Sequence, residues 1–191
     1  MSLTKIYILG SVASGKTTMA RELSNRLNIP HFELDNVVYL RLPSGDIKRT
    51  PGERDSEFHN ITDSDKWIIE GVFRKCFNDG FHKADIIILL DTPPFRRKYR
   101  ILKRWLCQKL RLANASYRPT LRMLLLMYKW SNDFERTKSE ILELLTIYKE
   151  KVVIMGNNTD MVKIESRLSP CQKCRGIRNN LGKWGFFRNL Y

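Results

Sequence analysis

The sequence predicts an α/β fold in which helices flank a parallel β-sheet, and three observations carry this prediction. Short apolar runs rich in β-branched and aromatic residues alternate with segments whose apolar residues recur every three or four positions. The first run is followed at once by a glycine-containing loop and then by a helical segment. The chain has 191 residues, which is enough for one well-buried core. We therefore expect one domain with an excursion.

Five strands are expected, each a short apolar run bounded by glycine, proline or charged residues. They cover residues 5–10, 31–34, 66–71, 84–91 and 151–155. Helical periodicity separates most of these runs, at residues 16–27 and 53–62 and again between the fourth and fifth strands. Because a helix between two strands favours a right-handed crossover, the strands are expected to pair in parallel.

Two or three helices are expected between the fourth and fifth strands. Residues 95–110 have an apolar side, formed by Tyr99, Leu102, Leu106 and Leu110, and a basic side. Pro119 interrupts the pattern, a second segment rich in leucine and methionine runs to about residue 130, and a third covers residues 133–149. Such patterns are typical of amphipathic helices.

A phosphate-binding loop is predicted between the first strand and the first helix, because Gly10, Gly15, Lys16 and Thr17 match the pattern G-x-x-x-x-G-K-[ST] in full. Glycines let backbone N–H groups converge on phosphate oxygens, and the helix N-terminus adds its positive end. Lys16 would reach the β- and γ-phosphates of ATP, and the Thr17 hydroxyl would bind Mg²⁺. The expected nucleotide-binding residues are Gly10, Ser14, Gly15, Lys16, Thr17 and Thr18.

The formal net charge of +14 is concentrated in two parts of the chain. Residues 93–131 contain eleven basic side chains and no acidic one, and six more basic residues follow Glu165, again without an acid. Basic, acid-free stretches of this kind suit polyanions, which include both nucleotides and nucleic acids. Charge alone therefore leaves two classes of partner open.

The sequence also indicates the compartment. The longest apolar runs, residues 86–90 and 123–127, are too short to cross a bilayer, and the first ten residues lack the layout of a signal peptide. Four scattered cysteines are too few for a disulfide framework in a chain of this length. We expect a cytoplasmic protein with reduced cysteines and no membrane contact.

The order of strand, phosphate-binding loop, helix and a second strand that ends in an acid resembles the adenylate-kinase-like nucleoside and nucleotide kinases. The segments HFELD, KWIIEGVFRKCF and ADIIILLDTPPFRRKYRILKRW more narrowly resemble small bacterial proteins labelled DNA topology modulation protein. The resemblance extends to about residue 168, and it implies a single domain over residues 1–168, followed by a basic C-terminal tail over residues 169–191. It implies a P-loop NTPase fold with three α/β/α layers, a five-stranded parallel sheet in the order 2-3-1-4-5, and a helical lid over about residues 93–149.

The resemblance also implies roles for single residues. Glu70 would lie beside the phosphate-binding loop and orient Mg²⁺ through water, and Arg74 would face the phosphoryl acceptor. Asp35, at the C-terminal end of the second strand, would contact a substrate hydroxyl or the Mg²⁺ shell. Arg100 and Arg104, one turn apart, would be lid arginines that close over the transferred phosphoryl group.

Alternatives remain open for several of these positions. Asp35 could simply cap the next helix, and each arginine could belong to a solvated basic face. Arg96, Arg97 and Lys103 compete with Arg100 and Arg104 for the lid role. The loop between the second and third strands contains further basic residues, among them Arg49, which would suit an anionic acceptor.

Two functional hypotheses follow. The first is a Mg²⁺-dependent kinase that transfers the γ-phosphoryl group of ATP to a small acceptor, such as a nucleoside or a nucleotide. The second is an ATP-binding, DNA-associated regulatory protein, whose region 93–131 or tail binds nucleic acid and which lacks small-molecule kinase activity. A GTPase is excluded because the chain has neither an N-K-x-D nor a D-x-x-G motif. The sequence predicts neither the identity of the acceptor nor an oligomeric state.

Overall fold

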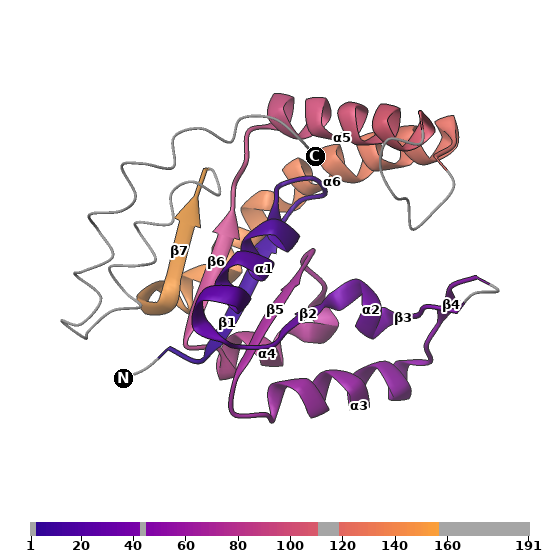
Figure 1. Cartoon of the computed structure of the whole chain (residues 1–191). Helices are drawn as coiled ribbons and strands as arrows, with labels where there is room; N and C mark the ends of the chain where they lie inside the picture. The colour runs from indigo at the N-terminus through magenta and orange to yellow at the C-terminus, as the bar shows by residue number, and fades with distance from the viewer. Residues whose placement is uncertain (1–2, 43–44, 111–118, 157–191) are drawn as a thin grey trace.

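The computed structural model describes residues 3–42, 45–110 and 119–156 (Figure 1). A five-stranded parallel sheet forms its centre, in the order β2-β5-β1-β6-β7. The strands are β1 (Lys5–Gly10), β2 (His31–Glu33), β5 (Trp67–Gly71), β6 (Ile86–Leu90) and β7 (Val152–Met155). Counted within this sheet alone, the order is 2-3-1-4-5, so the predicted fold class is confirmed. The predicted tail and the domain boundary near residue 168 lie outside the described residues.

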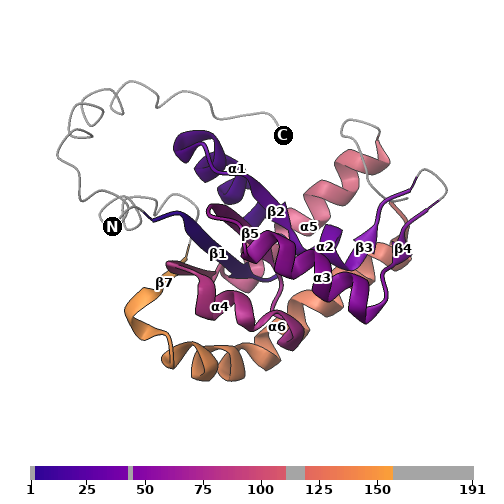
Figure 2. The same cartoon turned by 90° about the horizontal axis from the view of Figure 1, so that it is seen from below.

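Alternation along the strands supplies apolar side chains to both faces of the sheet. On β1, Ile6 and Ile8 pack against Met19 and Leu23 of helix α1 (Lys16–Leu27). The neighbouring residues of β1 join a second core on the opposite face, to which helices α2 (Leu34–Val38), α3 (Pro51–Thr62), α4 (Asp79–Lys83) and part of α6 (Leu121–Thr146) contribute. Figure 2 shows α1 on one side of the sheet and α4 and α6 on the other. The protein therefore has three layers, as predicted.

The connection between β2 and β5 contains an element that the sequence did not indicate. Strands β3 (Tyr39–Leu40) and β4 (Ile47–Lys48) pair as a short antiparallel hairpin. Helix α3 then begins at Pro51, two residues earlier than expected. Its start is fixed by a capping box, in which Thr50 accepts from the Glu53 amide and the Glu53 carboxylate accepts from the Thr50 amide.

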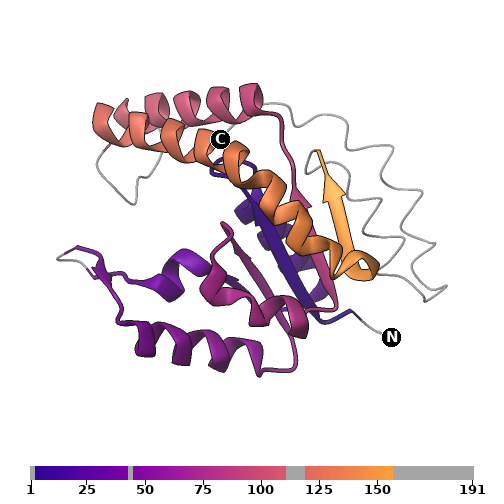
Figure 3. The ribbon, with the colours of Figure 1, turned by 180° about the vertical axis from the view of Figure 1, so that it is seen from behind.

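The second and third helices expected after Pro119 are one continuous helix, α6. The prediction of a break between residues 130 and 133 was wrong, because this stretch contains neither glycine nor proline and Ser131 is buried within the helix. The N-terminal half of α6 packs on α5 (Pro94–Lys109), and its C-terminal half packs on the sheet through Ile141 and Leu145. Figure 3 shows α5 and α6 lying alongside each other.

Helix α5 buries a different face from the one that its apolar residues suggest. Tyr99, Leu102, Leu106 and Leu110 are exposed. Its buried residues are Arg97, Ile101, Trp105 and Gln108. The short 3-10 helices η1 (Lys75–Phe77) and η2 (Lys149–Lys151) complete the described elements. No helix in the described ranges is long and apolar enough to cross a membrane.

Candidate active site

The loop between β1 and α1 has the geometry of a phosphate-binding loop. Gly15 lies in the left-handed region with φ of 101°, where a side chain would be strained, and Ala13 also has a positive φ of 58°. Gly15 is the N-cap residue of α1, so it offers no capping side chain to the amides of the first turn. A helix N-terminus of this kind attracts anions through its amides and its dipole.

Lys16 points into this loop. Its side-chain nitrogen Nζ donates to the Ser11 carbonyl oxygen at 2.7 Å, and the residue is buried. Burial lowers the pKa of Lys16, whereas the negative charges of Glu70 and Asp35 oppose the shift. Within the part of the chain that the structure describes, the buried hydroxyls of Ser11 and Ser14 have no hydrogen-bond partner. Phosphate oxygens would supply acceptors to all three side chains, so this loop fits a polyphosphate.

Thr17 and Glu70 meet at the edge of the same loop. The Thr17 hydroxyl donates to Glu70 Oε1 at 2.5 Å, because β5, which carries Glu70, pairs directly with β1. Burial raises the pKa of Glu70, while Lys16 and the hydrogen bond from Thr17 act in the opposite direction. No group of three histidine, cysteine or acidic side chains gathers for a metal among residues 3–42, 45–110 and 119–156. A hydroxyl and one carboxylate suit Mg²⁺, which takes its other ligands from phosphates and water.

Asp35 and Arg74 form an ion pair on the β2–β5 side of the loop, with Arg74 Nη2 3.0 Å from Asp35 Oδ1. The prediction that Asp35 ends the second strand was wrong. Strand β2 stops at Glu33, and Asp35 lies in the first turn of α2. Arg49 does not reach this pair, because its guanidinium donates to the backbone carbonyls of residues 36 and 37 in α2. It therefore supports the helix that carries Asp35.

Helix α5 approaches the phosphate-binding loop through Arg100. Its Nη1 atom donates to the Ser14 carbonyl oxygen at 3.0 Å and to the Ala13 carbonyl oxygen at 3.3 Å. Arg104, one turn further along, lies on the exposed side of the helix. The structure thus brings one of the two expected lid arginines to the loop and leaves the other at the surface.

Arg97 is the residue that sequence reasoning placed least well. It was one of several competing basic residues, yet its side chain is fully buried and forms an ion pair with Glu135 of α6. Its guanidinium carbon lies 5.3 Å from the centre of the Phe134 ring. The available signal was its spacing, because Arg97 lies four residues before Ile101 and eight before Trp105, on the buried side of the helix.

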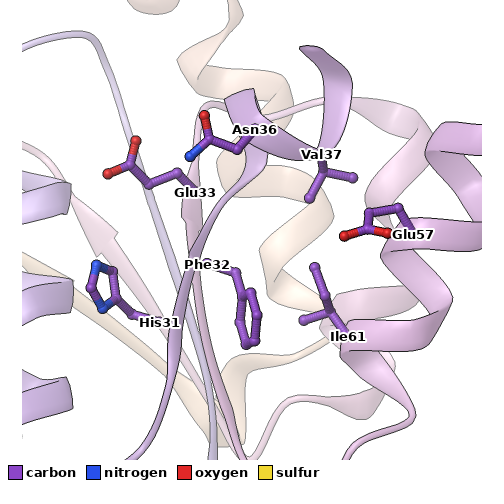
Figure 4. Close-up of a pocket in the computed structure, with 7 residues that line it drawn as sticks. All are labelled: His31, Phe32, Glu33, Asn36, Val37, Glu57 and Ile61. Atoms are coloured by element: carbon purple, nitrogen blue, oxygen red, sulfur yellow. The ribbon is translucent and has the colours of Figure 1, made fainter. Parts of the chain in front are cut away.

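A separate hollow of about 180 Å³ lies between β2, α2 and α3 (Figure 4). It is lined by His31, Phe32, Glu33, Asn36, Val37, Glu57 and Ile61. None of these seven residues belongs to the phosphate-binding loop, and two of them are carboxylates. This hollow is therefore distinct from the phosphate site and does not suit an anionic ligand.

The chain has a P-loop NTPase fold like that of shikimate kinase. Shikimate kinase from Acinetobacter baumannii, solved in complex with shikimate, matches with a TM-score of 0.52 and 16% identity, covering 94% of this chain and 96% of that one. An uncharacterized protein from Eubacterium ventriosum matches with a TM-score of 0.50 and 13% identity, covering 87% of this chain and 98% of that one. No protein-family model and no curated protein matches the sequence. The narrower resemblance to DNA topology modulation proteins is not supported by these comparisons, and the likeness at such identities establishes the fold alone.

Proposed function

We propose that this protein is a Mg²⁺-dependent kinase that transfers the γ-phosphoryl group of ATP to a small acceptor. The observation that carries the proposal is the contact between the Thr17 hydroxyl and the Glu70 carboxylate, next to the buried Lys16. This contact supports the proposal because Thr17 and Glu70 could hold Mg²⁺ while Lys16 binds phosphate at the same end of the loop. A glycine turn with only a structural role would need neither.

The nucleotide would be held by the backbone amides of residues 15–18 and by Lys16. The carbonyl of Ser11 now accepts from Lys16, so nucleotide binding would exchange this hydrogen bond for bonds to phosphate. A Mg²⁺ ion, bound by Thr17 directly and by Glu70 through water, would neutralise charge on the phosphates. Arg100, already in contact with the loop, would add positive charge as the phosphoryl group is transferred.

The acceptor would bind on the β2–β5 side, at Asp35 and Arg74. In the transfer step, the hydroxyl oxygen of the acceptor forms a bond to the γ-phosphorus, and the bond between that phosphorus and the β–γ bridging oxygen breaks. Asp35 takes the proton of the acceptor hydroxyl. Arg74, now paired with Asp35, would bind an anionic group of the acceptor. Acceptors with both a hydroxyl and an anionic group fit this pair. Nucleoside monophosphates are one such class, and hydroxy acids, suggested by the shikimate in the Acinetobacter baumannii structure, are another.

The alternative, a DNA-associated regulatory protein, draws its support from the basic region 93–131. Within the described part of that region, two of the basic residues do not belong to an exposed basic surface. Arg97 is buried, Arg100 turns to the loop, and an exposed apolar stripe that includes Tyr99 and Leu102 runs along α5. A phosphate backbone gains little from such a stripe. We therefore place this alternative second.

The test is a panel of nucleosides, nucleoside monophosphates and hydroxy acids, shikimate included, each incubated with ATP and Mg²⁺. Release of ADP above the acceptor-free background is expected for at least one compound, and Lys16→Ala should abolish it. ATP binding without transfer to any acceptor, together with DNA binding that weakens steeply as salt rises, would favour the regulatory protein instead.

A further inference from the structure

We propose that Arg97 binds the terminal phosphoryl group of a nucleoside triphosphate from within the junction of α5, α6 and the phosphate-binding loop. The inference rests on the proposed function, because it adds a ligand to the same phosphate site. Among the basic residues that compete for the lid role, it selects the one whose side chain is buried.

The first argument is the unsatisfied charge of Arg97. The side chain is fully buried, and only its Nη2 atom has a hydrogen-bond partner among the described residues, the carboxylate of Glu135. Its Nε and Nη1 atoms are buried without a partner in that part of the chain. A buried guanidinium with two unsatisfied nitrogens is costly unless a ligand supplies acceptor oxygens. Ser131, one turn before Glu135 on α6, also keeps a buried hydroxyl without a described partner.

The second argument is where α5 holds this side chain. Thr92, just before α5, donates its hydroxyl to the Ser14 carbonyl oxygen at 3.0 Å, and Arg100 donates to the same oxygen. Arg97 lies between these two contacts and three residues before Arg100, so both arginines share one side of the helix. Val12 and Ala13 of the loop also pack against the apolar cluster between α5 and α6. Arg97 therefore lies on the part of α5 that Thr92 and Arg100 hold against the loop.

The third argument is the sign of the local charge. Burial is the main cause that lowers the pKa of Lys16, and the positive charge of Arg97 acts in the same direction. Two buried cations that repel each other would be stabilised by an anion bound near both. Because Lys16 is the loop residue expected to reach the terminal phosphate, a phosphoryl group there would meet both cations.

The position of Arg97 also indicates that this residue would contact the nucleotide and not the acceptor. Arg97 follows β6, whereas Asp35 and Arg74 follow β2 and β5, on the other side of β1 in the sheet order. Glu135 and the Phe134 ring hold the guanidinium in place, so it is oriented before a ligand binds. An oriented arginine that meets only the third phosphate should distinguish ATP from ADP.

The experiment compares ATP and ADP affinities, with Mg²⁺, by titration calorimetry. Arg97→Met should weaken ATP binding about 10- to 100-fold and ADP binding less than about threefold, the scale of one hydrogen bond to a charged group. The matched control is Arg136→Met, which makes the same replacement next to Glu135 at a side chain that is 81% exposed. It should change neither affinity by more than about threefold. Equal weakening of ATP and ADP by Arg97→Met, or no weakening, would overturn the inference.

A second variant separates binding from folding. Arg97→Met/Glu135→Leu removes both partners of the ion pair, a change that is often neutral or stabilising when apolar groups replace the pair. It should melt cooperatively and show the same loss of ATP affinity. If it keeps the wild-type ratio of ATP to ADP affinity, or if only the KM of the acceptor rises, Arg97 does not bind the terminal phosphoryl group. If wild-type protein binds neither nucleotide, the proposed function itself fails.

Discussion

Replacing Glu70 by glutamine tests the metal-binding half of the site. Glutamine keeps an oxygen that can accept the hydrogen bond from Thr17, now 2.5 Å long, but it removes the negative charge. Because Glu70 is only 4% exposed, bulk water would not replace that charge. The change therefore isolates the contribution of the carboxylate to Mg²⁺ binding.

The expected loss of Mg²⁺ affinity follows from the hydrogen bond between Glu70 and the Mg²⁺-bound water, which would change from a charged to a neutral one. Hydrogen bonds to charged groups contribute about 1.5–3 kcal/mol and neutral ones about 0.5–1.5 kcal/mol, so the substitution removes about 1–1.5 kcal/mol. This difference corresponds to about a tenfold weaker apparent Mg²⁺ affinity in the presence of ATP. The unsubstituted protein should also bind Mg²⁺ more weakly as the pH falls, starting above the range of an ordinary glutamate, because burial raises the pKa of Glu70 and only its charged form helps. Glu70→Gln should flatten this pH dependence.

The raised pKa of Glu70 also predicts that folding stability changes with pH in the opposite direction to Mg²⁺ binding. Since the raised pKa lets the folded state keep a proton that the unfolded chain has lost, the nucleotide-free protein should lose stability as the pH rises from about 4.5 through the raised pKa of Glu70. Below that window the contribution is constant. Chemical denaturation at several pH values would show this slope in the unsubstituted protein and a smaller one in Glu70→Gln.

The assay is ATP affinity measured over a series of Mg²⁺ concentrations at several pH values. The matched control is Glu33→Gln, because Glu33 lies opposite Glu70 in the register of β2 and β5 but does not contact Thr17 among the described hydrogen bonds. Glu33→Gln should leave the Mg²⁺ dependence within about threefold of the unsubstituted protein. Equal Mg²⁺ dependence in all three proteins, or equal loss in both variants, would refute the assignment of Glu70.

Four further substitutions test other parts of the account. Arg100→Ala should lower the rate of phosphoryl transfer about a hundredfold, while ADP binding weakens only modestly. Arg104→Ala should lower that rate much less, because its side chain is exposed. Steady-state kinetics and ADP titration compare the two variants. Gly71→Ala would put a Cβ 2.7 Å from Leu34 atoms and should destabilise the fold by about 1–3 kcal/mol in urea unfolding, so unchanged stability would contradict the packing. Thr50→Ala removes the cap of α3 and should cost about 1 kcal/mol in the same measurement with ATP affinity unchanged.

The sequence was sufficient where local patterns decide the structure. The run at residues 5–10 is apolar because both faces of β1 are covered, and the glycines and Lys16 of the loop have no other common use than to surround phosphates. The predicted strands and the glycine loop between β1 and α1 therefore agree with the structure, and phosphate binding by that loop stays a prediction. The order of the strands came from the family resemblance, since periodicity indicates only that the pairing is parallel.

The sequence was insufficient where tertiary contacts decide. Helix α5 has both an apolar stripe and a mixed side, and its docking on α6 buries the mixed side with Arg97, because Glu135, 38 residues later, neutralises that charge. Periodicity cannot reveal a pair so distant in the chain. Asp35 was misplaced for a different reason, because the short α2 begins directly after β2 without a turn residue to mark the change.

The measurement that tests the central claim most directly follows the γ-phosphorus of labelled ATP in the presence of Mg²⁺ and the acceptor panel. The account predicts that wild-type protein moves the label to an organic acceptor, whereas Lys16→Ala, which should melt close to the wild type, neither transfers the label nor binds ATP tightly. Label that remains in ATP, or that reaches only inorganic phosphate, with every acceptor would contradict the kinase. Tight ATP binding by folded Lys16→Ala would contradict the phosphate-binding loop on which the account depends.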